Sequence, residues 1–147
     1  MTPNRWPGRL AAVALFVPPG SHVIDLGAGS GGLRERLHPS CTYQGADLPD
    51  FDMNRGRWPD GSYDVAVMAG VLEYARYPGA VFRHLARLAP LSIVTYSHGG
   101  RRDRLWTNDI SPDELRALAA KAGLAAEPVG TWRTPRVEPQ TIWRLRR

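Results

Sequence analysis

Residues 23–32 read Val-Ile-Asp-Leu-Gly-Ala-Gly-Ser-Gly-Gly and contain the main signal for the fold. The apolar residues Val23 and Ile24 run into Asp25, which is typical of a buried strand that reaches its carboxyl end. Glycines follow at alternate positions, and they allow a tight turn with no side chains between the backbone and a ligand. Residues 33–37 then have helical character. The stretch therefore predicts a strand, a glycine loop and a helix, which is the arrangement of a nucleotide-type cofactor site.

The glycines alone do not identify the cofactor. Gly27, Gly29 and Gly32 also satisfy the G-x-G-x-x-G pattern of dinucleotide-binding folds. A nicotinamide enzyme needs two mononucleotide-binding halves and a substrate region. The chain has 147 residues, enough for one compact α/β domain but too few for those parts. The length therefore argues against a dinucleotide enzyme.

The composition is that of a globular chain with one core, since 43% of the residues are hydrophobic. We expect residues 1–147 to form a single domain, with residues 1–20 as an N-terminal helix and linker. The apolar residues 10–17 follow Arg5 and Arg9 and superficially resemble a signal peptide. The run is short and leads straight into the glycine-loop strand, so a helix packed beside that strand is favoured. We therefore expect no membrane segment.

The cysteine content and the net charge limit which cellular compartment and which binding partners we expect. The single cysteine, Cys41, excludes an intramolecular disulfide and a cysteine-based zinc site, so we expect a cytoplasmic protein without a metal. Lys and Arg number 19 against 14 Asp and Glu, a net charge of +5. An arginine-rich chain can favour acidic ligands or nucleic acid. The arginines are scattered except at residues 101–104 and 144–147, however, and a bias in composition explains them as well.

Strand and helix patterns alternate along the rest of the chain. Only about 16 residues separate Asp47 from Asp64, too few for a full crossover helix, so we expect a loop there with a brief strand near residues 51–53. Helices are predicted at residues 10–17 and 78–88, and after Ser111, whose capping box opens a helix that ends at Gly123. The expected strands are residues 21–26, 42–47, 63–69, 91–97, 129–131 and 141–145. This order predicts an α/β, Rossmann-like three-layer sandwich, mostly parallel, with an antiparallel terminal strand pair.

Four features, in this order, resemble class I S-adenosylmethionine (SAM) methyltransferases of the small-molecule type, over residues 10–145. They are the loop from Asp25 to Gly31, Asp47 at the end of the second strand, residues 51–53 followed by 58–64, and residues 71–74. The last stretch, Val-Leu-Glu-Tyr, is similar to the family's usual Val-Leu-Glu-His. Each feature is a weak signal alone, but their order and spacing together are specific.

The resemblance implies SAM as the cofactor. The residues expected to bind it are Asp25, Gly27, Ala28, Gly29, Gly31, Asp47, Leu48, Asp52, Met53, Ala69 and Gly70. The glycine turn would let backbone N–H groups and a helix N-terminus approach the ligand. Asp25 would hold the methionine ammonium through ordered water or nearby backbone. Asp47 would accept both ribose hydroxyls.

The remaining assignments concern the adenine of SAM and its sulfonium group. Asp52 and the Met53 backbone would read the adenine edge, and Leu48 would sandwich the ring together with Met53. Ala69 and Gly70, just past the end of a strand, would lie beside the sulfonium and its methyl group.

Methyl transfer needs little besides positioning of the acceptor. His98 follows the strand at residues 91–97 and so lies at the carboxyl edge of the sheet, where ligands bind in open α/β folds. It is our candidate general base, with a loop histidine of no catalytic role as the alternative. No lid element covers the substrate side. We therefore expect a second copy, a partner protein or a bulky acceptor there, of acidic character if residues 101–104 contact it.

The expected function is transfer of a methyl group from SAM to a small or medium-sized acceptor by in-line displacement. RNA methylation is one alternative, but the sequence has no RNA-binding module and no basic stripe interleaved with aromatics, so nucleic acid is the less favoured partner. A non-catalytic SAM-binding or scaffold subunit is another. Residues 68–71 lack an Asn-Pro-Pro-Tyr-like signature, which argues against methylation of DNA bases. The sequence does not identify the acceptor, the attacked atom or the oligomeric state.

Overall fold

The computed structural model describes residues 7–99, 105–134 and 137–147. The arginine cluster at residues 101–104, for which we expect an acidic contact, lies outside this part of the chain. No helix in the described ranges is long and apolar enough to cross a membrane. The described residues also contain no group of His, Cys, Asp or Glu side chains that could hold a metal ion.

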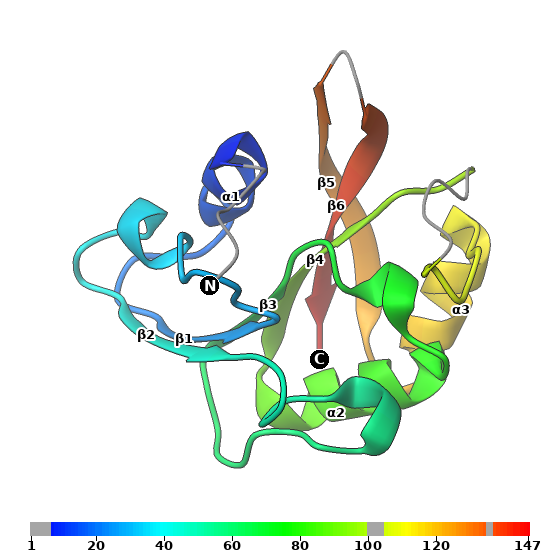
Figure 1. The fold of residues 1–147 in the computed structure, drawn as a ribbon, viewed down its shortest axis with the longest axis horizontal. Coiled ribbons are helices and arrows are strands. Elements are labelled where there is room, and N and C mark those ends of the chain that lie inside the picture. The colour runs from blue at the N-terminus through cyan, green and yellow to red at the C-terminus, as the bar shows by residue number, and fades with distance from the viewer. Residues whose placement is uncertain (1–6, 100–104, 135–136) are drawn as a thin grey trace.

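Six strands form one sheet in the order β2-β1-β3-β4-β6-β5 (Figure 1). The strands are β1 (His22–Leu26), β2 (Thr42–Ala46), β3 (Val65–Met68), β4 (Leu91–Tyr96), β5 (Ala125–Thr134) and β6 (Val137–Arg146). The first four are parallel, and β6 runs antiparallel to both β4 and β5. The structure thus confirms the predicted mostly parallel sheet with an antiparallel terminal pair. Strands β2 and β3 lie on opposite sides of β1, which makes the carboxyl end of β1 the point where the topology reverses.

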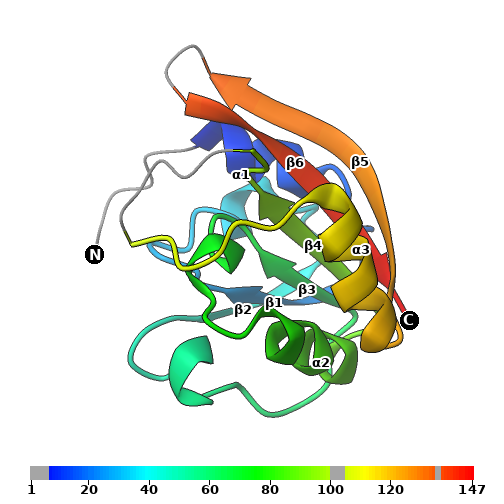
Figure 2. The ribbon, with the colours of Figure 1, turned by 90° about the vertical axis from the view of Figure 1, so that its right-hand side faces the viewer.

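Helices cover both faces of the sheet (Figure 2). On one face, α2 (Pro78–Leu88) and α3 (Pro112–Lys121) pack against every second residue of the strands, including Ile24, Met68 and Val94. On the other face, α1 (Pro7–Ala14) packs against the intervening residues, which include Val23 and Val67. Strands buried on both faces are typical of parallel sheets. The three predicted layers are confirmed, although the layer that contains α1 is the thinner one.

The predicted helix at residues 33–37 is absent. A single 3₁₀ turn, η1 (Arg34–Arg36), stands there, with Leu33 and Leu37 buried on the α1 side of the sheet. Pro39 follows closely, and a residue before proline is disfavoured in helical conformation, so the segment has no room for further turns. The glycine loop therefore has no α-helix behind it, and the expected approach of a helix N-terminus to the ligand is absent.

The link between β2 and β3 has no crossover helix, as predicted. The brief strand expected near residues 51–53 is reduced to one bridge, between Asp52 and Arg57, beside the 3₁₀ turn η2 (Met53–Arg55). A third 3₁₀ turn, η3 (Leu72–Tyr74), follows β3. These two turns and the glycine loop together surround the carboxyl ends of β1 and β3.

The terminal hairpin is longer than expected, because β5 and β6 each span ten residues. Pro128 and Pro139 lie inside these strands but outside the expected strands at residues 129–131 and 141–145. Pro128 lies on the edge strand β5 beside a register irregularity, where a missing N–H is tolerated. Pro139 lies beyond the residues of β6 that pair with β4, which are Thr141 to Arg146. The capping box of α3 and the left-handed Gly123 after it are as predicted.

Candidate functional site

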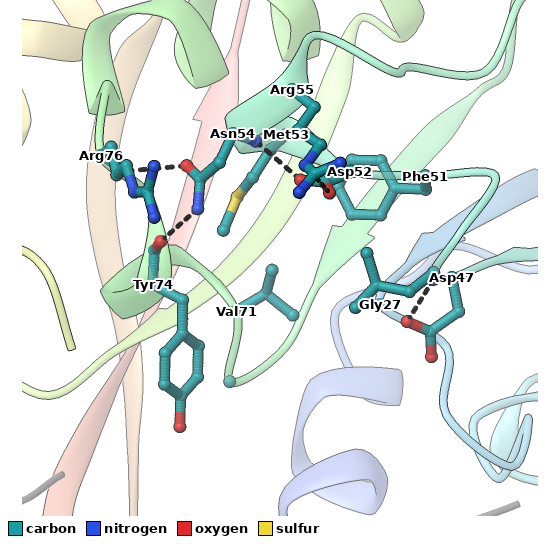
Figure 3. A pocket seen from close by; sticks show the side chains of 12 residues that line it. Gly27, Asp47, Phe51, Asp52, Met53, Asn54, Arg55, Val71, Tyr74 and Arg76 are labelled. Carbon is teal, nitrogen blue, oxygen red and sulfur yellow. Dashed lines mark hydrogen bonds and ion pairs between the residues drawn. The ribbon is translucent and has the colours of Figure 1, made fainter. Parts of the chain in front are cut away.

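A cleft of about 490 Å³ lies at the carboxyl ends of β1, β2 and β3. Its described lining consists of Gly27, Asp47, Leu48, Phe51, Asp52, Met53, Asn54, Arg55, Gly70, Val71, Tyr74 and Arg76. Figure 3 shows Gly27 and Asp47 on one side, and Tyr74 and Arg76 on the other. Six of the expected cofactor residues line it: Gly27, Asp47, Leu48, Asp52, Met53 and Gly70. The structure therefore brings together segments up to about 40 residues apart that the sequence assigns to one ligand.

The glycine loop is a tight turn that depends on left-handed backbone. The φ angles of Gly27, Gly29 and Gly31 are 81°, 54° and 79°, which side-chain-bearing residues rarely adopt. A Cβ on Gly27 would lie only 2.5 Å from Cγ2 of Val71, so this glycine also lets η3 approach β1. A Cβ on Gly29 would meet no atom within 4 Å. The loop thus leaves open space above Gly29, where a ligand can come close to the backbone.

The backbone N–H groups of the loop already have acceptors within the protein. Those of Gly27 and Ala28 both donate to the carbonyl of Ala46, at 2.8 and 3.1 Å, and that of Gly31 donates to Ala28 at 2.9 Å. The N–H of Gly29 donates to Oδ2 of Asp47 at 2.7 Å. These bonds join the loop to β2. The expected direct contact between these four N–H groups and a ligand does not fit this geometry. The loop instead leaves space for a ligand to lie close to its backbone.

Asp47 joins the end of β2 to the glycine loop. Besides the bond from Gly29, its Oδ1 accepts the N–H of Leu48 at 2.8 Å. The residue is exposed and lines the cleft. A carboxylate has about four lone-pair positions, so both oxygens keep capacity to accept further hydrogen bonds. Two backbone donors therefore fix the orientation of a carboxylate that can still bind hydroxyl groups.

Asp25 lies behind the loop and does not belong to the described lining of the cleft. Its side chain is buried at 3% exposure and accepts a hydrogen bond of 2.7 Å from the Tyr43 hydroxyl. Burial raises the pKa of Asp25 to about 6, although the bond from Tyr43 lowers it. The Tyr43 hydroxyl also lies near the positions that Cβ atoms on Gly31 and Gly45 would occupy, at 3.8 and 3.1 Å. The hydrogen-bonded Asp25 and Tyr43 side chains thus pack against the glycine loop on the side away from the cleft.

One wall of the cleft is built by residues that follow Asp47. Phe51 is buried at 4% exposure, and Met53 packs partly against the same core. The Asp52 carboxylate accepts the N–H of Asn54 at 3.1 Å and lies 3.7 Å from Nε of Arg55. The wall therefore combines apolar side chains with one carboxylate whose orientation is fixed by η2.

Asn54 closes this end of the cleft, and the sequence gives no signal for it. Its Nδ2 donates to the carbonyl of Tyr74 at 2.8 Å, and its Oδ1 accepts the N–H of Arg76 at 2.9 Å (Figure 3). These two bonds tie η2 to η3 across about 20 residues of sequence. Only a contact between distant segments gives Asn54 this role, so no local pattern could have predicted it.

The Gly70 end contains buried charge. The guanidinium of Arg9, from α1, lies where a Cβ of Gly70 would be, with Nη1 at 2.5 Å from that position. Glu73 lies in the same region at 1% exposure, and burial raises its pKa to about 7. Burial lowers the pKa of Arg9, while the charge of Glu73 raises it. Arg9 is not among the expected site residues. It directly precedes the apolar residues 10–17, and this pattern predicts a helix but no contact with the cleft.

No protein-family model matches the sequence, and no curated protein sequence matches it either. Solved structures do match the fold. Magnesium protoporphyrin IX methyltransferase from Synechocystis, with bound S-adenosylhomocysteine (SAH), aligns with a TM-score of 0.69 and 16% identity over 96% of this chain and 83% of its own. A cyclopropane-fatty-acyl-phospholipid synthase-like protein from Lactobacillus casei aligns with a TM-score of 0.75 and 12% identity over 97% and 90%.

A third match is a Burkholderia thailandensis methyltransferase that acts at N1 of 1,6-didemethyltoxoflavin, with that compound and SAH bound. It has a TM-score of 0.63 and 15% identity, over 98% of this chain and 79% of its own. The chain has the fold of class I SAM-dependent methyltransferases. The expected family resemblance is confirmed at the level of the fold.

Within this methyltransferase fold, His98 does not fit the role of general base. Its Nδ1 lies 2.6 Å from the carbonyl of Ile110, which can only accept a hydrogen bond, so Nδ1 carries the proton. Its Nε2 lies 3.0 Å from the indole N–H of Trp143, which can only donate. Burial lowers the pKa of His98. Both ring nitrogens are thus occupied, and His98 does not belong to the described lining of the cleft; the structure gives it a role in joining β4 to β6 and to the segment before α3.

Proposed function

We propose that this chain binds SAM in the cleft and transfers its methyl group to a small or medium-sized acceptor. The observation that supports this most directly is the Asp47 carboxylate, which Gly29 and Leu48 fix in place at the end of β2. Charged acceptors make the stronger hydrogen bonds, and a carboxylate can take both hydroxyls of a ribose. A carboxylate with a fixed orientation would bind them at a smaller cost in entropy.

The adenine would lie on the apolar wall beyond Asp47. Met53 and Phe51 line this side, and Leu48 is 68% exposed beside them. An exposed leucine at a cleft is an unfavourable feature of the free protein, and a planar ring against it would remove that surface from water. The Asp52 carboxylate would accept a hydrogen bond from the exocyclic amine.

The methionine end would lie by Gly27 and Gly70. Both glycines are in the left-handed region, at φ 81° and 69°, and a side chain at either position would collide with Val71 or Arg9. Since the loop N–H groups are occupied, an ammonium there would meet backbone carbonyl oxygens or water held by Asp25. In this placement SAM would extend along the cleft from Asp52 past Asp47 to Gly70.

SAM supplies an activated methyl group on a sulfonium, so the protein has mainly to position the acceptor and exclude water. Gly70 and the start of η3 would border the reacting methyl group. We expect the acceptor side to be covered in part by a second copy or another protein, because η1 and the link from β2 to β3 contribute no covering helix. The acceptor itself follows from neither the cleft nor the fold.

Titration calorimetry of the full chain with SAH, SAM and NADH tests the cofactor assignment. We expect SAH and SAM to bind and NADH to bind far more weakly. Equal or tighter binding of NADH would contradict the assignment. A screen of acceptors with labelled methyl groups then tests transfer. Binding without transfer to any acceptor would favour a non-catalytic SAM-binding subunit.

A further inference from the structure

A second hollow lies beside the cleft, and η2 lines both of them. Its lining consists of Met53, Asn54, Arg55, Gly56, Trp58, Tyr77, Pro78, Gly79, Ala80, Arg83 and His84. Three of these residues, Met53, Asn54 and Arg55, also line the cleft. We call this surface the η2 hollow. Its lining holds three aromatic or imidazole rings and two arginines, and it contains no carboxylate.

The rings of the η2 hollow are arranged as flat surfaces. Trp58 and His84 are stacked, with centroids 4.4 Å apart and planes at 12°. Trp58 also contacts Phe51, with the ring centroids 5.0 Å apart and the ring planes at 66°. Tyr77 stands directly before α2 and is 65% exposed. Trp58 and His84 are half-buried and each covers one face of the other, whereas the Tyr77 phenol is exposed, and aromatic rings placed in this way suit a planar ligand.

The charge around the η2 hollow is positive. The Arg55 side chain is 74% exposed, although its Nε lies 3.7 Å from the Asp52 carboxylate, and Arg83 is exposed on the first turns of α2. Arg87 lies on the same side of α2 as His84 and donates to the carbonyl of Pro59 at 3.3 Å. The pKa of His84 is lowered by burial and, in addition, by the charges of Arg87 and Arg83. The charges of Arg87 and Arg83 therefore reach the His84 ring.

We propose that the η2 hollow binds single-stranded nucleic acid. Bases would stack on Tyr77 and on the Trp58–His84 pair, and phosphates would contact Arg55 and Arg83. Base stacking on aromatic side chains with arginines along the backbone is the usual way that proteins bind unpaired strands. An acidic peptide would satisfy the arginines but would leave the flat rings without a partner. The combination of rings and cations therefore favours nucleic acid.

This surface was not visible in the sequence. Arg55 and Trp58 lie in the link after β2, while Tyr77, Arg83 and His84 lie about 20 residues later. Neither segment alone has a basic stripe interleaved with aromatics. The bonds from Asn54 to Tyr74 and Arg76 bring the two segments together. Since Arg55 and Arg76 also line the cleft, a strand bound in the η2 hollow would continue along its edge.

Binding can be measured without SAM, so the result does not depend on the proposed function. The probe is fluorescein-labelled oligo(U) or oligo(dT) of about 12 nucleotides, within the usual site size of single-strand binders, followed by fluorescence anisotropy. We expect binding that weakens with salt, because phosphate contacts release counterions. The two probes distinguish RNA from DNA. Absence of binding to both at low salt would overturn the proposal.

Four variants test the location. Tyr77→Ala should weaken binding roughly fivefold or more, as loss of one stacked base does, and Tyr77→Phe should retain it. Arg83→Gln should weaken binding and reduce the slope of log K against log salt by about 0.7, the value for one single-strand phosphate. Arg146→Gln removes a matched exposed arginine at the end of β6 and should have a smaller effect. Equal losses from Arg83→Gln and Arg146→Gln would show general attraction to a basic protein and overturn the site.

Two further measurements do not require the variants to fold. Polyglutamate carries the charge but no bases, and it should compete poorly; equal competition would favour an acidic protein partner instead. Photocrosslinking of 4-thiouridine-labelled oligo(U) to the wild-type chain should modify residues 53–58 or 77–84. Crosslinks confined to other segments would contradict the proposal.

Discussion

The guanidinium of Arg9 occupies the space in which a side chain of residue 70 would begin. Its Nη1, Cζ and Nη2 atoms lie 2.5, 2.8 and 2.8 Å from the Cβ position of Gly70. The N–H of Gly70 donates to Oγ1 of Thr95 at 2.8 Å, so this backbone cannot easily move aside. Helix α1 and the end of β3 therefore meet at the Gly70 end of the cleft only because residue 70 is glycine.

Gly70→Ala should lower the free energy of unfolding by more than left-handed strain alone, which costs about 1–2 kcal/mol. Gly123→Ala is the matched control, because Gly123 has φ 81° and a Cβ there would meet nothing within 4 Å. The excess cost should be smaller in an Arg9→Ala background, where the collision is absent. Urea denaturation of the four chains of this double-mutant cycle measures it. Equal costs for Gly70→Ala and Gly123→Ala would show that the Arg9 contact is not tight.

Asp47→Ala should weaken SAH binding by about 1.5–3 kcal/mol, as expected for charged hydrogen bonds. The effect on stability should be small, since Asp47 is exposed and water can replace it at the N–H groups of Gly29 and Leu48. Asp50→Ala is the control, because Asp50 is an exposed acid of the same loop outside the described lining of the cleft. Calorimetry with SAH compares the two. An unchanged affinity in Asp47→Ala would place the ribose elsewhere.

Gly29→Val should abolish SAH binding while the domain still folds. Gly29 has φ 54° and open space at its Cβ position, so valine adds strain and fills the approach to the ligand. Gly20→Val carries similar strain at φ 76°, also with nothing near its Cβ, but lies before β1, away from the cleft. Both variants should lose similar stability, and only Gly29→Val should lose binding. Retained affinity in folded Gly29→Val would exclude close approach of the ligand to this loop.

Asp25→Asn should stabilise the protein at neutral pH by on the order of 1–3 kcal/mol. The pKa of Asp25 is 3.8 without perturbation and about 6 in the folded state. Between these values the folded state binds more protons than the unfolded state, so the free energy of unfolding falls as pH rises, and the loss is complete above about pH 6. Asparagine can still accept the Tyr43 hydroxyl bond without a buried charge.

Urea denaturation between pH 3.8 and 7 measures this effect as the difference between wild type and Asp25→Asn. Glu73 titrates in an overlapping range, with a pKa near 7, but its contribution is common to both chains. Asp113→Asn, at an exposed position of α3, is the control for removal of a carboxylate from the surface. A difference that does not grow from low to neutral pH would contradict the raised pKa of Asp25.

His98→Ala should lower the free energy of unfolding by about 1–3 kcal/mol, because it leaves the buried Trp143 N–H without its acceptor. SAH affinity should be unchanged, since His98 is outside the described lining of the cleft. His38→Ala, an exposed histidine, is the control for stability. Loss of methyl transfer in a His98→Ala chain of unchanged stability would restore a catalytic role for this residue.

Local patterns accounted for most of the fold. The run from Val23 to Gly31, the acid at the end of β2 and the capping box of α3 each act over a few residues, so the sequence alone predicts them. The apolar runs of β1, β3 and β4 indicated a sheet buried on both faces, and the order of elements indicated a single Rossmann-like domain. These predictions held because hydrogen bonds and burial within short segments determine them.

Tertiary contacts decided the rest. Residues 33–37 have helical character, yet only η1 forms before Pro39. The hairpin of β5 and β6 is long because an edge strand tolerates Pro128 and tolerates register shifts. His98 was a candidate base by position, but Ile110 and Trp143, distant in sequence, occupy both its nitrogens. Asn54, Arg9 and the η2 hollow likewise depend on partners 20 or more residues away, and a sequence pattern carries no information about which distant groups will meet.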